Sequence, residues 1–181
     1  ASIQKERMQV YFIDNDEYFK QEDAFDDQGK LYADNDERCI FFAKGIMETV
    51  KKLNWSPDVI HIQGWLGALL PLYLRTYYKD EPIFYHTKTI TCFLRPPFEG
   101  SLDSELLSKV GFDEITEKEA PELKEPHSMN LIKIAARYSD AITTIKGVLP
   151  QEAISYIEST AKPFLYGETI ETTCKAYPQF Y

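Results

Sequence analysis

Residues 55–78 constrain the fold more than any other part of the chain. Residues 59–62 form a short apolar run, rich in β-branched side chains and as long as a buried strand. Gln63 and Gly64 interrupt this run, and Gly64 supplies the backbone freedom that a sharp turn requires. Residues 65–78 are apolar on nearly all sides, which is typical of a helix packed on a sheet, and Pro71 should kink or divide that helix. In an open α/β sheet ligands bind after the carboxyl ends of strands, so we expect a site at residues 63–65.

The same alternation of strand and helix continues along the chain. Further strands are predicted at residues 8–13, 87–93 and 141–145, and helices near residues 34–37, at Ser101, at Ser128 and after Pro150. Thr116 and Glu119 match a capping box for one more helix. We therefore predict an α/β fold, a Rossmann-like parallel sheet with helices on both faces, as one domain over residues 1–181. Residues 19–32 are expected to form a surface loop, and residues 162–181 a turn-rich segment on the domain surface.

Charge and composition exclude several classes of partner. The net charge is −9, from 20 basic and 29 acidic residues, which argues against nucleic acid or an anionic membrane. No apolar run approaches the roughly 20 residues that span a bilayer, and no signal peptide opens the chain. The cysteines are few and widely spaced, as expected of free thiols in a reducing compartment, so we predict a cytoplasmic protein.

Four separated motifs resemble one enzyme family. They are V-Y-F-I-D-N at residues 10–15, D-N-x-x-R-x-x-F-F at 34–42, P-D-V-I-H-x-x-x-W at 57–65, and N-L-x-K-x-A-x-x-Y-x-D-A-I-T-T at 130–144. This set resembles the glycogen/starch synthases, retaining glucosyltransferases that use ADP-glucose. The resemblance implies the N-terminal, acceptor-side half of a GT-B fold, with ADP-glucose as the donor substrate, an α-glucan or maltooligosaccharide as the acceptor, and no other cofactor. It also implies that the family's first strand, glycine-rich loop and nucleotide-binding domain lie outside residues 1–181.

The chain departs from the family pattern at the turn positions. Gln63 and Gly64 stand where the family has His-Asp, and Leu94 and Arg95 stand where it has His-Asn. Glutamine can hydrogen-bond to a sugar but cannot shuttle a proton near neutral pH. We therefore expect this chain alone to be inactive, as part of a larger glucosyltransferase. The alternative is a non-catalytic, degenerate synthase domain that binds glucan or a protein partner.

The candidate substrate-binding residues are Asp14, Gln63, Gly64, Trp65, Asn130 and Lys133. Trp65 suits either the core or a stacking surface for a glucose ring, and both readings stay open. Asn130 and Lys133 match family positions on one helix face, although a capped, solvated helix start explains them as well. No catalytic residue is assigned.

Two further features favour a structural explanation. The runs at residues 14–16 and 34–36 look like metal-binding D-x-D motifs, but a strand end and a helix cap account for both, so no metal site is predicted. His61 is expected to be a buried, hydrogen-bonded strand residue rather than a catalytic one.

Overall fold

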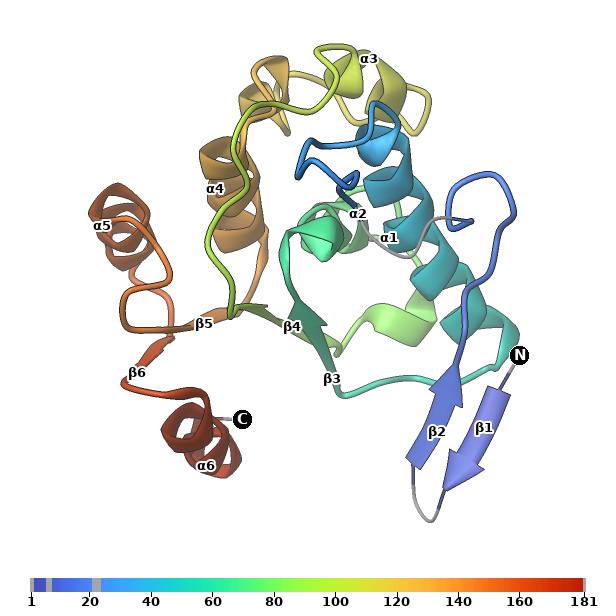
Figure 1. Ribbon diagram of the computed structural model, residues 1–181. Helices are drawn as coiled ribbons and strands as arrows, with labels where there is room; N and C mark the ends of the chain where they lie inside the picture. Colours follow the sequence, from blue (N-terminus) through green and yellow to red (C-terminus); the bar gives the residue numbers. More distant parts are fainter. Residues whose placement is uncertain (1, 6–7, 21–23, 181) are drawn as a thin grey trace.

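The computed structural model of the chain describes residues 2–5, 8–20 and 24–180. Within these residues, a parallel sheet is formed by β3 (Val59–Gln63), β4 (Lys88–Phe93), β5 (Ala141–Ile145) and β6 (Phe164–Gly167), in that spatial order. The register places Gln63 opposite Cys92, Phe93 opposite Thr144 and Ile145 opposite Gly167. The carboxyl ends of all these strands therefore meet at one edge of the sheet, and the predicted parallel sheet is confirmed (Figure 1).

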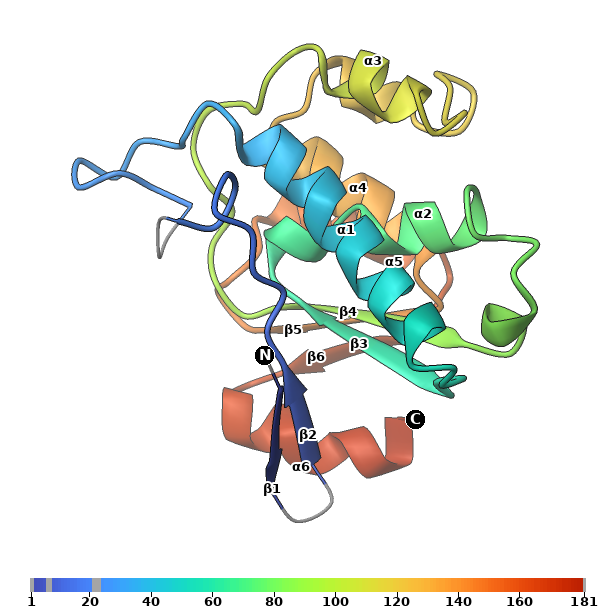
Figure 2. The same ribbon diagram turned by 90° about the vertical axis from the view of Figure 1, so that its right-hand side faces the viewer.

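Helices cover both faces of the sheet, as predicted. One face carries α1 (Asn35–Lys52), α2 (Leu70–Arg75), α4 (Ser128–Tyr138) and α5 (Gln151–Ser159), and the opposite face carries α6 (Ile170–Phe180) (Figure 2). The short helix α3 (Leu106–Gly111) lies farther from the sheet, over α1. The helices around the first face supply most of the core, including the fully buried Met47, Leu72 and Leu131. This is the Rossmann-like arrangement that the sequence predicts.

Pro71 divides the apolar segment that follows β3. The segment starts as the 3₁₀ helix η1 (Trp65–Gly67) and continues as α2, with Pro71 in the first turn of α2. Proline is well tolerated there because its missing N–H would have no partner within the helix. Gly67 allows η1 to approach the strand, since a Cβ at this position would lie 2.5 Å from Cγ2 of Ile62.

The N-terminal strand does not join the parallel sheet. β2 (Met8–Tyr11) pairs antiparallel with β1 (Ser2–Lys5) in a separate two-stranded sheet. The prediction that residues 8–13 belong to the parallel sheet was therefore wrong. The apolar residues of this run are largely exposed, with Met8 at 57% and Phe12 at 53%, so they are not the buried face of a central strand. Local composition identifies a strand but not the strand it pairs with.

The helix start predicted at residues 34–37 is confirmed, because α1 begins at Asn35, but its expected side-chain cap is absent. The helix starts predicted at Ser101 and Thr116 were wrong. Asp34 forms an ion pair with Arg38 at 3.1 Å and makes no cap hydrogen bond to α1. Ser101 bridges to His127, and α3 begins only at Leu106. Glu119 accepts a hydrogen bond from the Thr116 N–H at 3.0 Å, but this contact closes a turn that is followed by the 3₁₀ helix η3 (Pro121–Lys124). Each of these polar side chains interacts with a nearby group and does not cap the terminus of a helix.

Residues 162–181 were expected to be turn-rich, and this prediction was also wrong. They contain β6, the last strand of the parallel sheet, and α6, which packs on β5 and β6. The hydroxyl group of Tyr177 lies 3.4 Å from Sγ of Cys92 and 3.3 Å from Oγ1 of Thr143, which fixes α6 to the sheet. Because β6 has only four residues, its sequence carries too little periodicity to reveal a strand.

Close packing between β6 and α6 gives the first testable prediction. A Cβ at Gly167 would lie 1.8 Å from Oγ1 of Thr173, which is buried and donates to the Thr169 carbonyl at 2.7 Å. Gly167→Ala should therefore lift α6 from the sheet and lower the free energy of unfolding by about 1–3 kcal/mol. Hydrogen exchange should accelerate for the amides of α6. Gly111→Ala is the matched control, because no atom lies within 4 Å of its Cβ position; equal effects of the two substitutions would contradict this packing.

Candidate functional site

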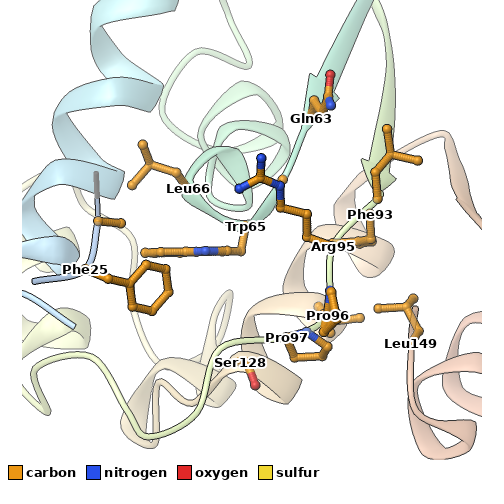
Figure 3. Close-up of a pocket in the computed structure, with 14 residues that line it drawn as sticks. Phe25, Gln63, Trp65, Leu66, Phe93, Arg95, Pro96, Pro97, Ser128 and Leu149 are labelled. Carbon is orange, nitrogen blue, oxygen red and sulfur yellow. The ribbon is translucent and has the colours of Figure 1, made fainter. Parts of the chain in front are cut away.

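A pocket of about 480 Å³ opens at the carboxyl edge of the parallel sheet (Figure 3). This volume is in the range of small-molecule sites, which are usually apolar with a few polar groups. Its lining comes from the segments after β3 and β4, from the loop before α1, from the start of α4 and from the segment before α5. The described lining residues are Ala24, Phe25, Gln63, Gly64, Trp65, Leu66, Phe93, Leu94, Arg95, Pro96, Pro97, Ser128, Ile132 and Leu149.

The turn after β3 forms one wall of the pocket. Gly64 has a φ of 84°, a conformation that favours glycine, and its N–H donates to the Cys92 carbonyl at 2.9 Å. This hydrogen bond ties the turn to the end of β4. No atom lies within 4 Å of the Cβ position at Gly64, so the space beside this backbone is open to a ligand. The exposed amide of Gln63 adds a polar group at the pocket.

Trp65 belongs partly to the core and partly to the pocket. Its ring lies edge-on to Phe98, with centroids 4.7 Å apart, and to Phe25 at 6.3 Å. Phe98 is buried, so this contact anchors the indole. The half-buried Trp65 also lines the pocket, so stacking of its ring on a glucose unit stays a prediction for this site.

The opposite wall contains residues that were not among the candidate substrate-binding residues, although Arg95 stands at one of the turn positions where the chain departs from the family pattern. Arg95 is the second residue after β4, and Pro96 and Pro97 stiffen the backbone after it. Ser128 is the first residue of α4, and Leu149 closes the pocket from the segment before α5. The position of Arg95 after a strand's carboxyl end was a usable signal, whereas nothing local connects Ser128 or Leu149 to Gln63.

The structure brings Gln63, Gly64 and Trp65 together but separates the other candidates from them. Asp14, Asn130 and Lys133 are not among the described residues that line the pocket. The side-chain amide of Asn130 donates to the carbonyl groups of Glu125 and Glu122, at 2.9 and 3.2 Å.

Lys133 and Asp14 have other surroundings. Lys133 faces α5, where its ammonium lies 3.6 Å from Glu152 and 5.9 Å from the centroid of the Tyr156 ring. Asp14 lies on the surface after β2. Asn130 thus contacts the segment before α4, and Lys133 connects α4 to α5.

Arg95 dominates the electrostatics of the pocket. It is the only residue with a formal charge among the described lining residues, which include no Asp, Glu, Lys or His. Hydrogen bonding to a sugar is available from Gln63, Ser128 and the backbone. The described lining therefore offers binding groups, but no side chain that exchanges a proton near neutral pH.

His61 lies outside the pocket and is exposed, so the prediction of a buried histidine was wrong. Its ring is edge-on to Tyr177 of α6, with centroids 5.0 Å apart. Partial burial against this face of the sheet lowers the pKa of His61. The reason for the error is that β3 is an edge strand of the parallel sheet, and one of its faces is only partly covered.

The D-x-D runs have local roles. Oδ1 of Asn15 accepts hydrogen bonds from the N–H groups of Glu17 and Tyr18, at 2.8 and 3.0 Å, which closes a turn. In the part of the chain that the structure describes, no group of three or more His, Cys, Asp or Glu side chains could hold a metal ion. The described helices likewise include none with the length and hydropathy needed to cross a membrane.

The fold and the pocket define a Rossmann-like α/β domain with a small-molecule site at the carboxyl edge of its sheet. The family model described as "Starch synthase catalytic domain" matches residues 1–159, so the chain belongs to this glycosyltransferase family. The fold agrees with one half of a GT-B glycosyltransferase.

Curated relatives agree with the family assignment. The chain is 29% identical to a glycogen synthase of Chlorobium limicola over 85% of its own length, and 31% identical to one of Thermotoga petrophila over 80%. A glycogen synthase of Elusimicrobium minutum is 32% identical over 75% of the chain. The chain spans only 31%, 29% and 28% of these relatives, respectively.

Proposed function

We propose that the chain is the acceptor-side part of a cytoplasmic glucosyltransferase. In this proposal the whole protein transfers glucose from ADP-glucose to the end of an α-1,4-glucan with retention, using no other cofactor. The family match over residues 1–159 supports the reaction class, and the relatives' name, glycogen synthase, supports the glucan acceptor. The nucleotide-binding domain of the GT-B fold would be supplied by another part of the protein or by a partner.

The pocket at Gln63, Gly64 and Trp65 is the observation that carries this proposal. Its aromatic and apolar lining suits the apolar face of a glucose ring, and its few polar groups suit the hydroxyls. A pocket with walls from one domain buries only part of a sugar, and an exposed hydrogen bond contributes only about 1 kcal/mol. We therefore expect the chain to bind a maltooligosaccharide with a Kd of about 1 mM, equivalent to about −4 kcal/mol.

The second candidate function is a non-catalytic domain that binds glucan or a protein partner. One property of the pocket favours this candidate. Gln63 stands where the family has a histidine, and none of the described lining residues has a side chain that titrates near neutral pH. Sequencing the gene beyond Tyr181 discriminates between the two candidates. A nucleotide-binding domain in the same product favours the enzyme, and a stop codon shortly after Tyr181 favours the non-catalytic domain.

A titration with maltotriose, followed by amide NMR shifts, tests the pocket. The largest shifts are expected at Gln63, Gly64 and Trp65. Trp65→Ala should weaken binding about tenfold through loss of the stacking surface, and Gln63→Ala about threefold through loss of one hydrogen bond. Trp55→Ala is the matched control, since Trp55 is 57% exposed and outside the described lining.

Trp65 also contacts the buried Phe98, so the melting temperature of Trp65→Ala must be measured alongside its affinity. Gln63→Ala removes no core contact and keeps the test decisive if the tryptophan variant unfolds. Shifts that cluster on the outer helix faces, or unchanged affinity in both pocket variants, would show that glucan does not bind at this pocket.

A further inference from the structure

We propose that the pocket selects a glucosyl unit that carries a phosphate group, and that Arg95 is the residue that binds this phosphate. The inference rests on the proposed function, because it takes the pocket as the sugar site. It goes further in assigning a charge to the ligand and a specificity-determining role to Arg95.

The first support is that Arg95 is available to a ligand. Among the described arginines, Arg38 pairs with Asp34 at 3.1 Å, Arg75 with Asp140 at 2.6 Å and Arg137 with Glu122 at 2.8 Å. No described carboxylate lies within ion-pair distance of Arg95, which is exposed at the pocket. The other arginines are therefore fixed by structural pairs, whereas the guanidinium of Arg95 is directed to the solvent and the pocket.

The second support is the sign of the charge around the pocket. The chain carries a net charge of −9, yet the described lining residues hold one positive charge and no negative one. A neutral glucan gains little from such a charge, while an anion gains directly. The N-terminus of α4, an 11-residue helix, also lies at the pocket through Ser128, and its dipole acts in the same direction.

The third support is geometric. In Figure 3 the Arg95 side chain extends from the end of β4 toward the turn that carries Trp65, while Ser128 lies on the other side of the pocket. A glucose ring against Trp65 would thus place a charged substituent toward the guanidinium. Pro96 and Pro97 restrict the backbone that follows Arg95.

The chemistry of arginine selects a particular class of anion. A guanidinium donates two parallel hydrogen bonds to an oxyanion, and phosphate and carboxylate both accept them. Phosphate is the stronger candidate because it brings up to two charges and three acceptor oxygens to a site whose described lining includes no carboxylate. Glucose 1-phosphate and glucuronate separate these two anions in a binding assay.

Isothermal titration at low ionic strength tests the inference, with glucose 1-phosphate, glucose, glucuronate, inorganic phosphate and maltotriose as probes. Glucose 1-phosphate should bind about tenfold more tightly than glucose, and more tightly than glucuronate or inorganic phosphate. Arg95→Gln should abolish this preference, so that glucose 1-phosphate and glucose bind with equal affinity. Arg95→Lys should retain part of it as a point charge. Lys79→Gln, an exposed cation outside the described lining, is the control and should leave it intact.

The outcomes separate this inference from the proposed function. If maltotriose binds through Trp65 but glucose and glucose 1-phosphate bind equally, only the role of Arg95 is wrong. If glucose 1-phosphate binds through Arg95 and maltotriose does not bind, the glucan proposal is wrong and the phosphate site stands. A preference for glucose 1-phosphate that survives in Arg95→Gln, or stronger binding of glucuronate, overturns the inference. If no sugar binds at all, both proposals are wrong.

Discussion

Replacing Lys109 by methionine should lower the free energy of unfolding by about 3 kcal/mol at neutral pH, because it leaves a buried carboxylate without its counter-charge. Lys109 lies on α3, and its ammonium is 2.6 Å from Asp36 and 2.8 Å from Glu37, both in the first turn of α1. The side chain of Asp36 is fully buried, and its Oδ1 has no hydrogen-bond partner. Methionine keeps most of the volume of lysine, so the loss reports the charge rather than a cavity.

The pH dependence of this loss follows from the pKa of Asp36. Burial raises the pKa of Asp36, although its hydrogen bond with Lys109 opposes that rise. Without Lys109 the pKa should rise further. When the folded-state pKa of a carboxyl group lies above its unfolded-state pKa, the free energy of unfolding of the protein falls as the pH rises through the folded-state pKa. The deficit of Lys109→Met should therefore be largest at neutral pH and should shrink as the pH falls and Asp36 becomes protonated.

Urea unfolding at pH 7 and at about pH 5 checks this expectation. The control is the double variant Asp36→Asn with Lys109→Met, in which the buried charge and its partner are removed together. It should recover much of the stability at pH 7, since the two residues are directly coupled. A deficit that is the same at both pH values, or a double variant no better than Lys109→Met, would show that the ion pair is not what holds α3 to α1.

Elements with strong local signals were predictable from the sequence. α1 repeats apolar residues at helical spacing over 18 residues, and β4 has the sequence of a buried strand, with five of its six residues buried. The turn at Gln63 and Gly64 was predictable for the same reason, because strand, glycine and helix follow one another in the chain. In these places local preference and tertiary structure agree.

The errors concern features that depend on distant partners. The pairing of β2 with β1 and the addition of β6 to the sheet are long-range choices that a four-residue strand does not encode by itself. The far wall of the pocket is assembled in the same way, since Phe25, Ser128 and Leu149 come from three separate segments. Asn130 and Lys133 match the family's residue types but are not among the described residues that line the pocket, so their part in substrate binding stays a prediction.

The isolated chain should transfer glucose from ADP-glucose to glycogen at less than about one-thousandth of the rate of a full-length glycogen synthase. Two observations support this proposal. The chain spans only 29% of the glycogen synthase of Thermotoga petrophila, and Gln63 cannot exchange a proton near neutral pH. Incorporation of labelled glucose into glycogen is the measurement, with a complete synthase assayed in parallel.

A variant of the pocket separates the two reasons for inactivity. Gln63→His together with Gly64→Asp restores the family's residue types at the turn, but it adds no group to stabilise the charge that develops on the departing nucleotide. Preorganised charge stabilisation is usually the largest single contribution to catalysis, so this variant should remain inactive as well. The φ of 84° at position 64 makes aspartate strained there, and Gln63→His alone is therefore measured beside it. Turnover comparable to that of the complete synthase, in the chain itself or in either variant, would show that this half of the fold holds the essential catalytic groups.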